Sequence, residues 1–255
     1  MGELRVDNLA KSYRRKEGWN TTRTLRVFDK VSFSVSEGEF VSIIGPSGCG
    51  KSTLLNLSAG LDRATSGVVY VDGRQVRGPG LDRGVVFQEF ALFPWLTVTG
   101  NIEFGLRSKG VPTSERRAIA QRYVDLVGLS GFENFHPYRL SGGMRQRVGI
   151  ARALAVEPSV LLMDEPFGAL DAQTRESMQK ALGEIWQATR KTVLFITHDI
   201  REAIYLSDRV LVMSGRPATI SLELIVDLPR PRNRHDDTFQ DYERRLEQAI
   251  GHTAS

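Results

Sequence analysis

The sequence predicts an α/β protein with a parallel-sheet core, an N-terminal antiparallel β flank and an inserted helical segment. Short apolar runs recur along the chain, and each is followed by loop signals and a helical pattern. Such runs are typical of strands buried on both faces, and their alternation with helices indicates a parallel sheet. The runs lie at residues 40–44, 85–87, 160–163, 193–196 and 210–213.

The antiparallel flank is predicted from the first seventy or so residues. Apolar side chains alternate at Val31, Phe33 and Val35, and a short apolar run at 68–71 ends at Asp72-Gly73. Alternation bounded by tight-turn residues is typical of antiparallel strands, of which one face is buried.

The helical segment is predicted where strand signals disappear, between residues 89 and 158. Residues 115–127 have a helical pattern behind Thr113 and Ser114, which are suitable start residues. A second helix is indicated by apolar residues at helical spacing, namely Met144, Val148, Ala151 and Leu154.

A further helix is predicted after Asp171, because aspartate is a favourable N-cap. Its apolar side chains fall on one face, at Met178, Leu182, Ile185 and Trp186. Near the end of the chain, the two prolines within residues 228–232 favour extended backbone, and a last helical stripe follows at Phe239, Tyr242, Leu246 and Ile250.

These patterns divide the chain into three parts. An α/β core with the antiparallel flank is expected at 1–88 and 159–226, a helical subdomain at 89–158, and a tail with a short helix at 227–255. The stripe of the tail helix is expected to pack back on the core. The basic residues before it, Arg230, Arg232 and Arg234, are interpreted as a solvated face, with anionic lipid as the alternative.

Composition excludes disorder as the main state, since 41% of the 255 residues are hydrophobic and 25% are charged. A net charge of +4 is too small to indicate nucleic acid or a membrane surface. The single cysteine, Cys49, cannot form an intrachain disulfide, and no secretory signal is recognised, so the cytosol is expected. No apolar run reaches 18 residues, so association with a membrane would need another protein.

A glycine-rich loop between the strand at 40–44 and the helix after it predicts a phosphate site. Its spacing matches G-x-x-x-x-G-K-[ST], in which backbone amides and the helix N-terminus surround phosphate oxygens. Lys51 is expected to bridge the β- and γ-phosphates, and the Ser52 hydroxyl is expected to bind Mg²⁺. The loop comprises Gly45, Pro46, Ser47, Gly48, Cys49, Gly50, Lys51, Ser52 and Thr53.

Two carboxylates, Asp164 and Glu165, follow the strand at 160–163. Consecutive strand residues point to opposite faces, so we expect one carboxylate to hold Mg²⁺ and the other to act on an attacking water. Gln88 and His198 follow two other predicted strands. An amide oxygen at Gln88 suits Mg²⁺ or water, and an imidazole at His198 suits a γ-phosphate.

A second glycine turn, Ser141-Gly142-Gly143, opens the helix that carries Met144. Its bare amides suit an anion, but the segment lacks a lysine. A plain helix cap and an anion site therefore remain equally open from the residues alone.

Taken together, these motifs resemble the ATP-binding cassette ATPases of membrane transporters, over about residues 3–225 and in the right order. The resemblance rests on the Lys51 loop, Gln88, LSGGMRQR at 140–147, VLLMDEP at 160–166, Ala169-Leu170-Asp171 and His198. It implies a P-loop NTPase fold, an ATPase with ATP and Mg²⁺ as cofactors, and Ser52, Gln88 and Asp164 as metal ligands.

The same resemblance implies the roles of further residues. Ser141, Gly142 and Gly143 would bind the γ-phosphate of ATP held by a second copy, so two nucleotides are sandwiched in a head-to-tail homodimer. Asp171 would belong to the loop that communicates across that dimer, Glu165 would be the catalytic base, with Gln88, His198 and Lys51 as the other catalytic residues, and Tyr13 would stack on adenine.

Met144 stands where the commonest motif of the family has Gln, and this looks like the importer branch that serves nitrate, sulfonates and taurine. The resemblance implies permease subunits as partners, an extracytoplasmic solute-binding protein as an indirect partner and no nucleic acid. It also implies a peripheral position at the cytoplasmic face of the plasma membrane.

An aromatic segment after Gln88 comprises Phe90, Leu92, Phe93, Pro94 and Trp95. It is interpreted either as core or, by the resemblance, as the groove that accepts a cytoplasmic helix of a permease.

Three alternatives stay open: a cassette ATPase of DNA repair or translation, an importer ATPase for an unrelated solute, and a non-hydrolysing scaffold. Intact Glu165 and His198 disfavour the last. Pairing with a different cassette chain also stays open.

Overall fold

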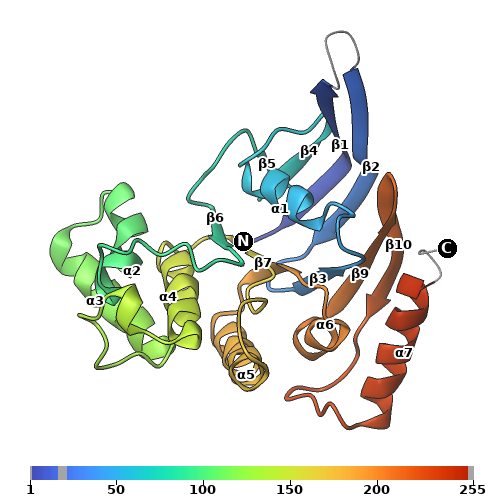
Figure 1. Ribbon diagram of the computed structural model, residues 1–255. Coiled ribbons are helices and arrows are strands. Elements are labelled where there is room, and N and C mark those ends of the chain that lie inside the picture. The colour runs from blue at the N-terminus through green and yellow to red at the C-terminus, as the bar shows by residue number, and fades with distance from the viewer. Residues whose placement is uncertain (1, 17–21, 252–255) are drawn as a thin grey trace. The chain divides into compact units, whose positions relative to one another are not determined.

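The computed structural model describes residues 2–16 and 22–251 (Figure 1). The chain divides into two compact units, Met1–Pro79 with Thr192–Ser255, and Gly80–Lys191. The helices between residues 89 and 158 fall in the second unit, but the domain boundaries given above remain a prediction.

The first unit contains a mixed sheet with the strand order β5-β4-β1-β2-β10-β9-β3-β8. Its strands are β1 Leu4–Lys16, β2 Thr22–Val35, β3 Phe40–Ile44, β4 Ser66–Val71, β5 Arg74–Gln75, β8 Thr192–Ile196, β9 Arg209–Gly215 and β10 Ala218–Ile225. β1 pairs antiparallel with β2 and β4, which confirms the predicted flank. β3 pairs parallel with β8 and β9, which confirms the predicted core.

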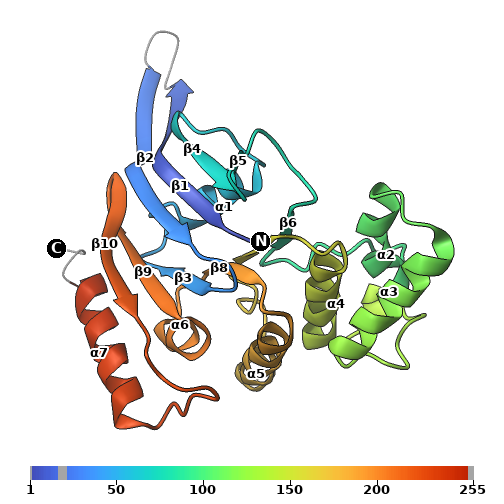
Figure 2. The ribbon, with the colours of Figure 1, turned by 180° about the vertical axis from the view of Figure 1, so that it is seen from behind.

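Helices cover this sheet on both faces (Figures 1 and 2). α1 (Lys51–Ala59) buries Leu54, Leu55 and Leu57, while α6 (Ile200–Leu206) and α7 (Asp237–Gly251) lie on the other face. Every residue of β3 is buried, as its uninterrupted apolar run predicts.

The tail helix α7 packs back on the first unit as predicted. Phe239 and Leu246 are fully buried and join a cluster with residues of α6, β9 and β10. The arginines before α7 are not the solvated face that the sequence indicates, because Arg232 is buried and Arg230 forms an ion pair with Asp208 at 2.6 Å.

The second unit contains β6 (Arg83–Val86) and β7 (Val160–Asp164), which pair in parallel. Between them lie α2 (Val98–Ser108), α3 (Thr113–Leu126), the 3₁₀ turn η1 (Pro137–Arg139) and α4 (Gly142–Ala155), and α5 (Ala172–Thr189) follows β7. The helical patterns of 115–127 and 144–154 are therefore confirmed as α3 and α4.

Candidate functional site

The glycine loop joins β3 to α1 in the first unit. Gly45, Gly48 and Gly50 have φ of 155°, 77° and 106°, which side chains rarely adopt. A Cβ atom on Gly45 would lie 2.0 Å from the carbonyl oxygen of Met213, and one on Gly50 would lie 2.4 Å from Cγ1 of Val27. The loop is therefore too tightly folded to accept a side chain at Gly45 or Gly50.

Lys51 is the first residue of α1, and its side chain turns back over this loop. Its ammonium donates hydrogen bonds to the carbonyl oxygens of Gly45 at 2.8 Å and Pro46 at 3.2 Å. The residue is only 6% exposed. A positive charge is thus held beside the amides that begin α1, an arrangement that suits a polyphosphate.

Ser52 and Thr53 complete the first turn of α1. Ser52 is exposed at the helix N-terminus, where its hydroxyl is a suitable ligand for a hard cation. Within residues 2–16 and 22–251, no three His, Cys, Asp or Glu side chains gather as a metal site. The predicted Mg²⁺ ligands are Ser52, Gln88 and Asp164, and they lie in different units. Only Asp164 is one of these four residue types, so the three ligands would not form a group of this kind.

Tyr13, on β1, is held by two polar residues. Its hydroxyl donates a hydrogen bond to Oδ2 of Asp62 at 2.8 Å, and the ammonium of Lys11 lies 4.5 Å from the ring centre. Partial burial and the neighbouring carboxylate of Asp62 raise the pKa of Tyr13. The ring is 42% exposed, which is consistent with a stacking surface for a planar base.

His198 follows β8, and its loop is fixed by its neighbours. Ile43 of β3 pairs with Ile196 of β8, so the glycine loop and His198 leave the same edge of the sheet. Thr197 donates its hydroxyl to Glu202 at 2.7 Å, and Asp199 accepts from the amide of Glu202 at 3.1 Å. His198 itself is exposed at this edge.

The other predicted residues belong to the second unit, where β6 and β7 end side by side. Val86 pairs with Met163, so Gln88 and the two carboxylates follow neighbouring strand ends. A Cβ atom on Gly168 would lie 3.2 Å from Nε2 of Gln88, so the amide of Gln88 lies against the turn that follows Glu165.

Glu165 differs from the expectation for a strand residue. β7 ends at Asp164, and Glu165 has φ of 42°, in the left-handed region. The direction of the Glu165 side chain is therefore not set by the alternation of side chains along a strand. It is set by the sharp change of backbone conformation between Asp164 and Glu165. A non-glycine residue in this region costs on the order of 1–3 kcal/mol, and such residues are common at functional sites.

The second glycine turn is a helix cap. The Ser141 hydroxyl accepts a hydrogen bond from the amide of Met144 at 3.3 Å, and Gly142 and Gly143 form the first turn of α4. A Cβ atom on Gly143 would lie 2.8 Å from Cγ2 of Thr174, so this turn packs against the start of α5. The exposed Ser141 side chain lies at the N-terminus of α4. The helix dipole also stabilises an anion at this position.

Asp171 caps α5 as predicted. Its carboxylate accepts a hydrogen bond from the amide of Thr174 at 3.0 Å. Hydrogen bonds from Thr174 lower the pKa of Asp171.

The aromatic segment is partly exposed and is held in place by a buried amide. Trp95 is 71% exposed, and its ring centre lies 5.6 Å from that of Phe93. Phe93 also packs on Phe104 of α2 at 4.1 Å. The fully buried Asn101 accepts from the Phe93 amide at 2.9 Å and so fixes this segment. We call Phe93, Trp95 and Phe104 the aromatic surface.

Sequence reasoning did not find the residues that hold these side chains. Lys11 and Asp62, which position Tyr13, have no recognisable signal because they are 51 positions apart. Asp199 did have a recognisable signal in the sequence, because an Asp followed three residues later by a Glu, here Glu202, is a pattern typical of a helix start.

Comparisons with known proteins agree with the fold and with the glycine loop described above. A sequence profile of the family described as ABC transporter matches residues 28–168. The nitrate import ATP-binding protein NrtD of Synechocystis sp. is 54% identical over 208 residues, which are 80% of this chain and 78% of that protein. The taurine import ATP-binding protein TauB of Rhizobium johnstonii is 51% identical over 227 residues, or 89% and 85% of the two chains.

A third relative, the aliphatic sulfonates import ATP-binding protein SsuB of Bacillus anthracis, is 46% identical over 234 residues, or 92% of each chain. Among solved structures, a dimeric ATP-binding cassette in a post-hydrolysis state bound to ADP and Pi has a TM-score of 0.74 and 35% identity, and covers 89% of this chain and 100% of that one. These similarities confirm the predicted fold class.

Proposed function

Because the chain belongs to the ABC transporter family, in which it is an ATP-hydrolysing subunit, we propose that it drives uptake of a small oxyanion or sulfonate through partner permease subunits. Nitrate, aliphatic sulfonates and taurine form the class that the relatives support, since their names specify import of these solutes. Met144, which replaces the common Gln of the LSGG segment, supports the same branch.

The observation that carries the nucleotide site is the tight loop between β3 and α1. Its positive-φ glycines leave backbone amides free of side chains, and Lys51 supplies a charge that can move from the carbonyl oxygens of Gly45 and Pro46 to phosphate oxygens. In this proposal the adenine stacks on the exposed ring of Tyr13.

Hydrolysis is assigned to residues at the strand ends. The oxygen of a water bonds to the γ-phosphorus, the bond from that phosphorus to the β–γ bridging oxygen breaks, and Glu165 takes the proton of the water. His198 and Gln88 orient the γ-phosphate and the water. Mg²⁺, held by Ser52, Gln88 and Asp164, would neutralise phosphate charge when bound.

The second glycine turn completes the site in a homodimer. Ser141, Gly142 and Gly143 present a helix N-terminus to the γ-phosphate that a second copy holds, and Asp171 lies in the loop that crosses the dimer. The dimeric state of the solved cassettes supports this proposal.

The aromatic surface is the proposed docking place for a cytoplasmic helix of the permease. Trp95 exposes a large apolar side chain, which is typical of an interaction site rather than of core. The structure has no helix long and apolar enough to span a bilayer among the described residues. The relatives named as import ATP-binding proteins support a place at the cytoplasmic face of the membrane, with the permease as the attachment of the chain.

Turnover of Glu165→Gln tests the catalytic assignment. A glutamine cannot take the proton, so hydrolysis should fall about 10²- to 10⁴-fold while ATP still binds and the dimer persists. Glu115→Gln, an exposed change in the first turn of α3, is the control and should keep normal turnover. Unchanged hydrolysis in Glu165→Gln would remove this residue from the role of base.

Purification from membranes tests the transport assignment. Trp95→Ala should lose the permease while keeping ATP binding, because the exposed ring contributes to docking but little to the fold. Tyr138→Ala, at a residue that is 74% exposed on η1, should keep the permease. Co-purification with ribosomes or DNA instead of a permease would favour the other cassette functions.

Solute identity is tested with the co-purified complex in vesicles. ATP-dependent uptake of nitrate, taurine or an alkylsulfonate supports the proposal. Uptake of a solute outside this class would leave the ATPase role intact and overturn the solute assignment.

A further inference from the structure

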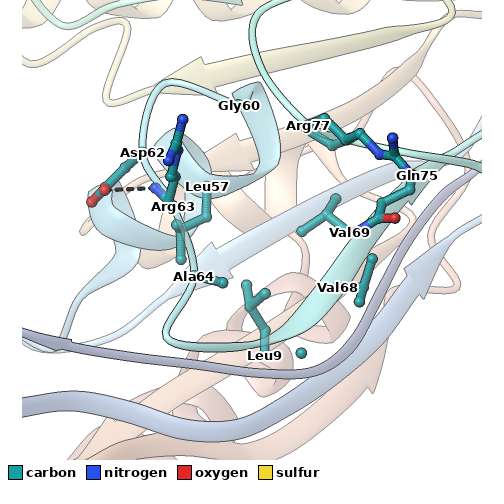
Figure 3. Close-up of a pocket in the computed structure, with 12 residues that line it drawn as sticks. Leu9, Leu57, Gly60, Asp62, Arg63, Ala64, Val68, Val69, Gln75 and Arg77 are labelled. Carbon is teal, nitrogen blue, oxygen red and sulfur yellow. Dashed lines mark hydrogen bonds between the residues drawn. The ribbon is translucent and has the colours of Figure 1, made fainter.

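A cavity of about 180 Å³ lies in the first unit, beside the end of α1 and next to β4 (Figure 3). Apolar side chains form part of its lining, with Leu9 at the bottom and with Leu57 and Val69 on opposite sides. Polar side chains form much of the rest, namely Asp62, Arg63, Gln75 and Arg77. A cavity of about 150 Å³ is sufficient for a benzene-sized group. This volume and the side chains of Leu9, Leu57 and Val69 therefore suit a compact group with an apolar part.

Two arginines flank the opening of this cavity. Figure 3 shows Arg63 on the side of Asp62, and Arg77 next to Gln75 on the opposite side. Both arginines are exposed, and neither guanidinium is hydrogen-bonded or ion-paired to any residue of 2–16 or 22–251. Unpaired guanidiniums on both sides of an opening attract an anion and match the geometry of carboxylate, sulfonate and phosphate groups.

Asp62, which also lines the cavity, does not cancel this charge. Its Oδ1 accepts from the Lys11 ammonium at 2.8 Å and from the Arg63 amide at 2.6 Å, and its Oδ2 accepts from the Tyr13 hydroxyl at 2.8 Å. The hydrogen bond from Lys11 is the main cause that lowers the pKa of Asp62. The carboxylate is thus compensated by its own partners, and the guanidiniums remain available.

We propose that this cavity binds a small organic anion, with a carboxylate, sulfonate or phosphate on a compact apolar group, and that its occupancy is coupled to nucleotide binding through Asp62 and Tyr13. The binding site stands on the cavity and its arginines alone. The coupling rests on the proposed function, because it needs Tyr13 to stack on adenine.

The coupling follows from the shared carboxylate. Asp62 forms part of the cavity wall and also holds the Tyr13 hydroxyl, so a ligand that orders the wall also orders the ring. A ring that is already ordered costs less to stack on a base, so the anion should tighten nucleotide binding. Coupling of this kind is reciprocal, and the nucleotide should tighten the anion by the same factor.

Calorimetric titration of the full chain with benzenesulfonate tests the site. We expect binding in the millimolar range, about ten-fold weaker binding in the double variant Arg63→Gln/Arg77→Gln, and unchanged binding in Arg74→Gln. Arg74 is a matched control because it is an exposed arginine of β5 that does not line the cavity. Sulfate, which lacks the apolar group, and benzylamine, which has the opposite charge, should bind at least several-fold more weakly.

Absence of benzenesulfonate binding, or equal binding by the double variant, would overturn the site. Equal binding of sulfate would show that the arginines act alone and would overturn the role of the apolar cavity.

The coupling is tested by measuring the Kd of ADP with and without saturating benzenesulfonate. The Kd should fall about two- to five-fold in the natural sequence, and the ratio of the two Kd values should approach one in Tyr13→Phe. A ratio of one in the natural sequence would overturn the coupling. Failure of ADP to bind at all would overturn the proposed function, whereas failure of benzenesulfonate to bind while ADP binds would overturn only this inference.

Discussion

Arg232 donates a hydrogen bond from its guanidinium to the carbonyl oxygen of Ser207, just beyond the end of α6, at 2.5 Å. The same group also reaches the carbonyl oxygens of Ile204 and Val226. Burial lowers the pKa of Arg232 to about 10, which leaves the group charged at neutral pH. A cationic side chain at the C-terminal end of a helix satisfies carbonyls that have no partner within the helix.

Arg232→Met should therefore destabilise the protein by about 2–4 kcal/mol, because it leaves several buried carbonyl groups without donors. Methionine keeps the apolar length of the side chain, so lost packing contributes little. Urea unfolding at neutral pH measures the change, with Arg244→Met as the control at a residue whose side chain is 70% exposed. A change of less than about 0.5 kcal/mol in Arg232→Met would show that water replaces the guanidinium without cost.

The glycine loop gives a second prediction, based on a pair of glycines. Gly45 and Gly73 both have positive φ, of 155° and 73°, but only Gly45 has an atom within 3 Å of the Cβ position. Gly73→Ala should cost about 1 kcal/mol for the backbone conformation alone, and Gly45→Ala should cost clearly more and weaken ATP binding. Thermal unfolding with and without ATP distinguishes them, and equal effects of the two changes would contradict the steric argument.

Local signals explain why much of the fold could be predicted from the sequence. The apolar run of β3 and the Asp171 cap of α5 act on neighbouring residues, so pattern and structure agree there. The strand β10 was not predicted, although apolar and polar residues alternate along Ala218–Ile225 and supplied a usable strand signal; its position in the sheet depends on pairing with β9. The range of β6 shifted to Arg83–Val86 because Arg83 and Gly84 are not apolar.

The candidate site shows the same division between local and distant effects. The loop around Lys51 was predicted because its glycines and lysine are consecutive and their chemistry depends on local backbone. The contacts of Tyr13 with Asp62, and of Arg232 with α6, join residues that are far apart along the chain. Single-sequence patterns contain no signal for such pairs, so Arg232 was misread as part of a solvated charge run.

Asp62 gives a prediction of pH dependence. Its pKa lies below the ordinary 3.8, mainly because of the hydrogen bond from Lys11. A carboxylate with a lowered folded pKa adds stability above its unfolded pKa, and this contribution is lost as the pH falls through the folded value. Asp62→Asn should therefore unfold at a lower temperature than the natural sequence above about pH 5, and the difference should shrink below about pH 4. A difference that is constant from neutral pH down to acid would show that the charge of Asp62 is not what stabilises the flank.

Glu165 gives a prediction that separates stability from activity. Its φ of 42° is unfavourable for any residue with a Cβ atom, and glycine removes that cost. Glu165→Gly should stabilise the protein by about 1 kcal/mol and still lose hydrolysis, whereas Glu165→Gln should lose hydrolysis without gaining stability. Lys30→Gly is the matched control, since Lys30 is exposed with φ of 50°, and it should gain stability while turnover stays normal. If Glu165→Gly is less stable than Glu165→Gln, the side chain at this position stabilises the fold by more than its backbone conformation costs. The positive φ would then not be a strain that serves catalysis.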